Sequence, residues 1–206
     1  MGGRAVWGLL LLLGLGVTSL CIAVALIVRP KLDKRLWLPV LVVLVVLTAF
    51  LFIGGLRAEE AAYRVGCMSN TRLIGVAMMR YAEEHDNQYP DDFAVLLRQG
   101  YLTTLNVFVC PSRRKGIPRE FWEAEPKTIA AEELQKGNCY ELVPGATPAW
   151  PYDTIILHDK EGNHRGAGRN CFFNDGHVEW LSEAEFQRRM RAQEAKLREM
   201  RKKEVE

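Results

Sequence analysis

Side chains with metal-binding chemistry gather in one stretch of the chain, residues 158–177. This stretch holds three histidines and two aspartates, together with asparagines. Imidazole with carboxylate suits zinc or another transition metal, whereas carboxylate and amide oxygens with loop carbonyls suit calcium. The candidate ligands for a zinc or calcium ion are His158, Asp159, Asn163, His164, Asp175 and His177.

The same stretch has a structural interpretation that needs no ligand. Asn174-Asp175-Gly176 separates two runs of alternating apolar residues, which is a strong hairpin signal, and Asn and Asp tolerate positive φ in turns. The glycines at 162, 166 and 168 are typical of a flexible loop. The residues alone leave the turn and the metal site open as alternatives.

An enzymatic site would need a nucleophile or an acid–base pair with an orienting partner. His164 and Asp175 form a candidate dyad, but every nucleophile that would complete it is a cysteine with a competing structural role. The sequence contains no GxSxG, HExxH, P-loop or dinucleotide-binding fingerprint. We therefore expect a protein that is not an enzyme.

Four of the five cysteines, Cys67, Cys110, Cys139 and Cys171, fall after residue 57. An even number of cysteines favours disulfides in an oxidising compartment, and four cysteines allow three pairings. Buried free thiols are the alternative. The sequence has no CxxC motif, which argues against a thioredoxin-like site, a zinc ribbon or attached haem.

The N-terminal quarter of the 206-residue chain predicts two membrane spans, because no charged residue occurs in 5–28 or in 36–56. About 20 apolar residues cross the hydrocarbon core. The second run contains fifteen Leu, Val, Ile and Phe residues, worth at most about −5 to −9 kcal/mol of insertion free energy. The first run is longer than a signal-peptide core, so residues 1–56 are expected to form a transmembrane hairpin.

Orientation follows from the loop at 29–35, which carries four basic residues. Basic loops stay in the cytoplasm, so residues 57–206 are expected on the other side of a cytoplasmic membrane, in a multi-pass protein. This part holds 22 basic and 24 acidic residues. Such a balance gives no argument for nucleic acid as a partner.

Hydrophobic periodicity predicts an α+β fold for the exported part, with one long helix covering a small antiparallel sheet. Leu73, Ala77 and Tyr81 mark one apolar stripe on a helix over 57–86. A capping box, Ser182-x-x-Glu185, opens a charged helix to about residue 203, which we interpret as solvated. Between them we expect a helix at 92–99, a strand or turn at 105–110, a helical insertion at 128–136, and strands at 139–143, 154–158, 169–173 and 177–181.

Three segments in order resemble a known family. They are the run from Cys67 to Tyr81, Tyr89-Pro90 with the later Cys110-Pro-Ser112 turn, and a C-terminal signature running from His164 to Asp175-Gly176. This pattern is similar to bacterial prepilin-like proteins, also called type II secretion pseudopilin-like proteins, that end in a His…Asp-Gly signature. The likeness covers most of residues 57–181, and it has one residue more than usual between the histidine and Asp-Gly.

The resemblance implies a pilin-like exported domain over 57–181, followed by a charged helix over 182–206. It also implies Cys67–Cys110 as one disulfide pair, because the resembling proteins carry both cysteines. Cys139 and Cys171 are then expected to pair across neighbouring strands. The chain lacks the leader cleavage site and the glutamate near the start of the span that align pilin subunits in a filament. The expected function is therefore a membrane-anchored structural or assembly protein acting through contacts with pilin-like or secretion proteins, or with its own copies. The alternative is an exported metal-binding sensor or scaffold that does not polymerise.

Overall fold

The computed structural model describes residues 34–205, and its longest element is helix α2 (Lys34–Glu84). The chain divides into two compact units, Met1–Glu59 and Glu60–Glu206, and α2 contributes residues to both. The predicted span at 5–28 lies outside the described residues. Each unit is therefore considered by itself.

In the first unit, α2 carries apolar side chains on all its faces. Leu38 is 64% exposed, Phe50 73% and Leu51 65%. A soluble amphipathic helix buries one stripe and keeps a polar face, and residues 38–53 show neither feature. Within the described residues, one helix is long and apolar enough to cross a membrane. The predicted span at 36–56 lies on it, so the described part supports a single candidate anchor rather than a multi-pass arrangement.

The second unit is built on a four-stranded antiparallel sheet whose strands follow chain order. They are β1 (Tyr140–Leu142), β2 (Ile155–Asp159), β3 (Gly168–Phe173) and β4 (Val178–Ser182). All four predicted strands are confirmed, with boundaries shifted by a few residues.

The predicted hairpin between β3 and β4 is also confirmed. The amide of Gly176 donates a hydrogen bond of 2.9 Å to the carbonyl of Phe173, and Gly176 has φ +89°. Glycine adopts this left-handed conformation without steric cost. The Asp175-Gly176 part of the His…Asp-Gly signature is therefore explained by the turn that these residues form.

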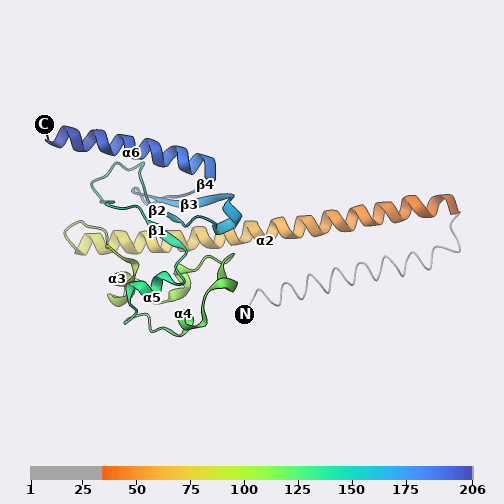
Figure 1. Ribbon diagram of the computed structural model, residues 1–206, viewed down its shortest axis with the longest axis horizontal. Helices are drawn as coiled ribbons and strands as arrows, with labels where there is room; N and C mark the ends of the chain where they lie inside the picture. The colour runs from red at the N-terminus through yellow and green to blue at the C-terminus, as the bar shows by residue number, and fades with distance from the viewer. Residues whose placement is uncertain (1–33, 206) are drawn as a thin grey trace. The chain divides into compact units, whose positions relative to one another are not determined.

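Residues 60–84 of α2 cover one face of the sheet (Figure 1). Ile74 and Met78 of the helix are fully buried with Phe172 of β3 in the larger of two core clusters. Gly75 lies directly over the Phe172 ring, where a Cβ atom would overlap it. Within the predicted apolar stripe, Ala77 is 3% exposed but Leu73 is 49% exposed, so the face that packs is centred on Ile74 and Met78. Glycine permits the close approach of helix and sheet.

Helix α6 (Glu183–Val205) covers the other face of the sheet. Phe186 and Leu197 are 3% and 6% exposed. The side chain of Gln193 hydrogen-bonds both the amide and the carbonyl of Ile155, at 2.7 and 2.9 Å. The interpretation of this helix as solvated is wrong, because a few apolar residues suffice to cover a narrow sheet. Its predicted cap is present, since the amide of Glu185 donates to the Ser182 hydroxyl.

The chain between α2 and β1 forms short helices that complete the larger core. Asp92, at the start of the predicted 92–99 helix, caps the first of them by accepting a hydrogen bond from the Val95 amide. Residues 105–108 are a 3₁₀ helix rather than a strand, and the predicted insertion at 128–136 is helical over five residues only. The elements are α3 (Phe93–Arg98), η1 (Leu105–Phe108), η2 (Arg114–Gly116), α4 (Arg119–Glu123) and α5 (Ala131–Gln135).

A long apolar helix packed on a small antiparallel sheet is a pilin-like architecture, so the α+β prediction is confirmed.

The contact between α2 and β3 gives a stability prediction. Alanine at position 75 gains about 1 kcal/mol of helix propensity, but overpacking against Phe172 costs about 1–3 kcal/mol. We expect Gly75→Ala to lower the melting temperature of the full chain in detergent. Gly55→Ala on the same helix is the control, because a Cβ there meets no atom of the described residues within 4 Å. A Gly75→Ala chain that melts higher than the wild type would contradict the described packing.

Candidate functional site

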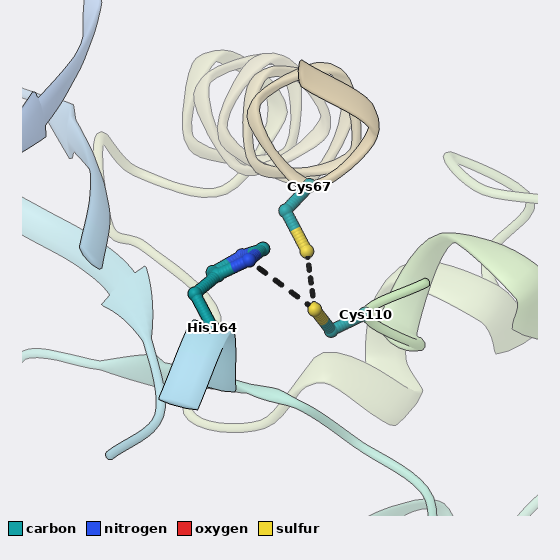
Figure 2. A group of neighbouring side chains, drawn as sticks. All are labelled: Cys67, Cys110 and His164. Carbon is teal, nitrogen blue, oxygen red and sulfur yellow. Dashed lines mark hydrogen bonds between the residues drawn. The ribbon is translucent and has the colours of Figure 1, made fainter. Parts of the chain in front are cut away.

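Two thiols, an imidazole and a carboxylate meet in the core of the second unit. Cys67 comes from α2, Cys110 from the turn after η1, His164 from the 3₁₀ turn η3 (Asn163–Gly166), and Asp159 from the end of β2. Figure 2 shows the two thiols and the imidazole pointing toward one another. Cys67, Cys110 and Asp159 are 0% exposed and His164 is 1% exposed.

The two thiols lie unusually close together. Sγ of Cys67 is 2.6 Å from Sγ of Cys110, and both are free thiols in the structure. A disulfide has an S–S length of about 2.05 Å. The structure brings together the pair that the resemblance implies, and the bond itself stays a prediction.

Cys139 and Cys171, the other expected disulfide pair, are not brought together. Cys139 belongs to the larger core cluster and Cys171 to the smaller one under α6. Each thiol faces a nearby carbonyl instead, that of Gly137 for Cys139 and that of Arg169 for Cys171. Alternation along β3 sends Cys171 away from the face on which Cys139 lies.

Both ring nitrogens of His164 lie near groups that stabilise the protonated form of the imidazole. Nε2 lies 3.6 Å from Sγ of Cys110 and 3.5 Å from Oδ2 of Asp159. Nδ1 lies 3.0 Å from Oε1 of Glu60. Burial by itself lowers the pKa of His164, but the interactions with Asp159 and Cys110 outweigh it and raise the pKa to about 10. The raised pKa favours the protonated form of the ring at neutral pH.

Cys110 is the thiol whose anion this surrounding stabilises. The hydrogen bond donated by Cys67, with further bonds from His164 and from the Ser112 hydroxyl at 3.0 Å, outweighs burial. Together they lower the pKa of Cys110 to about 5. The site is thus built to hold a thiolate, which is the form of cysteine that binds metals and attacks electrophiles.

Among the described residues, only one of the two carboxylate oxygens of Asp159 has hydrogen-bond partners. Its Oδ2 accepts hydrogen bonds of 2.9 Å from both the amide and the side chain of Asn170. Its Oδ1 is buried and has no hydrogen-bond partner among the residues that the structure describes. Buried polar atoms are nearly always paired, so this oxygen marks a feature of the site that internal packing does not explain.

The backbone that presents His164 is strained. His164 and Arg165 have φ +51° and +57°, a left-handed conformation that costs a non-glycine residue about 1–2 kcal/mol. Strain of this kind persists where the surrounding structure requires it, often at functional sites. The stretch predicted as a flexible loop is instead a tight turn that aims one imidazole into the core.

The structure divides the six predicted metal ligands among four places. His164 and Asp159 are in the site. Asn163 donates to the Cys139 carbonyl, and His158 lies against Phe186 beneath α6. Asp175 and His177 pair with each other at the exposed hairpin turn. The six therefore do not form one ligand set.

Sequence reasoning missed three members of the site. Cys67 and Cys110 were assigned only to disulfides, and Glu60 to no role. The cysteines are separated by 43 residues, and Glu60 is 104 residues from His164. No local spacing rule joins residues so far apart. The Cys110-Pro-Ser turn and His164 both belong to the motifs that resemble the pseudopilin-like family. Their joint occurrence is the signal that could have suggested a single site.

Thiol, imidazole and carboxylate in this order also resemble a nucleophilic catalytic constellation. Burial argues against that use, because the exposed fractions of Cys110 and His164 leave no face for a substrate. That the chain is not an enzyme stays a prediction.

No protein-family model, curated protein or solved structure matches the chain. The pilin-like likeness is therefore one of architecture and of short motifs. Fold and side-chain geometry carry the functional conclusions.

Asp159 and Asp175, both predicted from the sequence as metal ligands, should behave differently when each is replaced by asparagine. Asp159→Asn removes the buried charge opposite the imidazolium and should destabilise the full chain by on the order of 3 kcal/mol. Asp175→Asn keeps the turn chemistry on an exposed loop and should change stability by no more than about 0.5 kcal/mol. Urea denaturation in detergent compares the two variants, and equal losses would contradict the assigned site.

Proposed function

We propose that this chain is a membrane-anchored, pseudopilin-like structural protein that acts through protein contacts, as an accessory to a secretion or pilus-like system. The observation that carries the proposal is the run of exposed apolar side chains on the first part of α2. Each such side chain forgoes about 1.5–3 kcal/mol of burial free energy if it stays in water. The residues are Leu38, Val40, Val42, Val43, Val45, Val46, Leu47, Phe50, Leu51, Phe52 and Ile53.

The proposed orientation places residues 60–206 on the extracytoplasmic side. Lys34 and Arg35 at the start of α2 belong to the basic loop that the positive-inside rule keeps in the cytoplasm. Glu59 and Glu60 follow the apolar run at its other end. A further span at 5–28 is part of the proposal, and it would make the protein a two-span inner-membrane protein.

The proposed contact surface is the outer face of α2 in the second unit. Val65, Leu73 and Val76 are 66%, 49% and 40% exposed, while Ile74 beside them is fully buried. Exposed apolar side chains at helical spacing form a face suited to another apolar helix. Because the chain lacks the glutamate that aligns pilin subunits, the proposed role is accessory rather than that of the main filament subunit.

A second candidate function is an exported metal-binding scaffold or sensor that does not polymerise. The buried cluster of Cys67, Cys110 and His164 favours it. This ligand set differs from the one predicted from the sequence, because Asp175 and His177 lie at the hairpin turn. The two functions are compatible, because anchoring and metal binding use different parts of the chain.

The orientation is tested by labelling with a maleimide that does not cross membranes. Asp175→Cys places an exposed thiol at the hairpin turn and should react in intact spheroplasts. Lys34→Cys should react only after the membrane is opened. The four native cysteines of the second unit are buried and give a low background. Labelling of Lys34→Cys alone in intact spheroplasts would reverse the orientation.

The contact surface is tested by photo-crosslinking in intact membranes. A photoreactive residue at Leu73 should form adducts with another membrane protein or with a second copy of the chain. The same residue at Lys127, which is exposed on the segment before α5, is the control. Adducts at Lys127 and none at Leu73 would contradict a contact through α2.

A further inference from the structure

The potential ligand atoms of Cys67, Cys110 and His164 lie close enough together to share one metal ion. Its two sulfurs and one imidazole nitrogen all lie within 4.8 Å of one another, and all three residues are buried. They come from α2, the turn after η1 and the η3 turn, and Figure 2 shows them converging. A site assembled from three separate segments holds its ligands in place only when the unit is folded.

We propose that Cys67, Cys110 and His164 bind one thiophilic divalent cation, Zn²⁺ being the ion that this ligand set fits best, with Asp159 as the fourth ligand. Thiolate and imidazole are the ligands of structural zinc, which is four-coordinate and tetrahedral. Asp159 is buried beside this group, with Oδ2 3.5 Å from Nε2 of His164 and with Oδ1 lacking a hydrogen-bond partner among the described residues. Its carboxylate lies outside the group of three close ligand atoms, so it would have to move toward the two sulfurs to complete a four-coordinate site.

The second contact of His164 supports the same assignment. A histidine that binds a metal through one ring nitrogen commonly donates its other N–H to a carboxylate, which fixes the tautomer and the orientation of the ring. Nδ1 of His164 lies 3.0 Å from Oε1 of Glu60, which leaves Nε2 directed at Cys110. Glu60 is therefore a positioning residue in this proposal, acting through His164.

The left-handed backbone at His164 is a further independent observation. An ordinary loop would relax at this position, where φ is +51°, and the next residue, Arg165, repeats the conformation at +57°. The strained turn places the imidazole next to two thiols and a carboxylate. That placement is what a metal site requires of its ligands.

The spacing of the sulfurs shows what must change when the ion binds. Two sulfurs bound to one tetrahedral zinc at 2.3 Å lie about 3.8 Å apart, whereas they are 2.6 Å apart here. An ion would move the two sulfurs apart, whereas an external oxidant that removes two hydrogen atoms would join them as a disulfide of about 2.05 Å. The two products have different masses.

The test uses the full chain, extracted in detergent without chelator, reduced with a phosphine and supplied with Zn²⁺ or Co²⁺. We expect one zinc per chain by elemental analysis and by native mass spectrometry. Cobalt should give the intense near-ultraviolet band of thiolate-to-metal charge transfer together with tetrahedral visible bands. His164→Gln should lose stoichiometric binding, whereas the control His177→Gln should keep it.

Glu60→Gln separates a positioning role from a structural one. It should weaken zinc affinity about 10–100-fold while leaving the melting temperature of the metal-free chain close to that of the wild type. Equal affinity in Glu60→Gln and wild type would remove Glu60 from the site.

A folded, reduced chain that takes up neither zinc nor cobalt would overturn the proposal. So would a chain that carries a Cys67–Cys110 disulfide and still binds no metal after reduction. Binding that persists unchanged in His164→Gln would equally overturn it. None of these outcomes bears on membrane anchoring, which depends on residues 38–56, so the two proposals fail separately.

Discussion

Helix α2 carries two different patterns of apolar side chains along one continuous helix. From Leu38 to Glu59 apolar side chains are exposed on all faces of the helix, and from Glu60 onward one stripe is buried against the sheet while the opposite face is open. A helix satisfies its own backbone hydrogen bonds, which is why it can cross hydrocarbon. The same backbone in water needs only one apolar stripe to bind a sheet. The rest of the second unit is organised around that stripe.

The packing of the sheet follows from this constraint. A four-stranded sheet has two faces to cover, and α2 covers one while α6 covers the other. Gly75 brings the helix close to Phe172, and the short helices between α2 and β1 enclose the remaining side of the larger core. The buried polar site lies within this arrangement, where Cys67 and Glu60 of α2 meet Cys110 and His164. It therefore links the helix to the turn after η1 and to the η3 turn.

Local patterns in the sequence predicted the elements well. Short apolar runs located the four strands, the Asp175-Gly176 turn located the hairpin between β3 and β4, and Asp92 and Ser182 marked helix starts. These signals act over a few residues, so they can be read without knowing the fold. The burial of α6 was missed, because whether Phe186 is covered depends on a sheet face formed by residues far away in the chain.

The site was less predictable for the same reason. His164 and Asp159 were among the candidates, but Asp175 and His177 were grouped with them only because they are near in sequence. The real neighbours of His164 are Cys110, 54 residues away, and Glu60. Such contacts are set by tertiary packing, which single-sequence periodicity does not encode.

The most direct test of the account is the depth of α2 in a lipid bilayer. Nitroxide labels at Val46 and at Ser69, on the full chain in nanodiscs, would report collisions with oxygen, which concentrates in hydrocarbon, and with a water-soluble nickel chelate. The account predicts that oxygen dominates at Val46 and the nickel chelate at Ser69. Strong nickel collisions at Val46 would contradict it, because the apolar run of α2 would then lie in water.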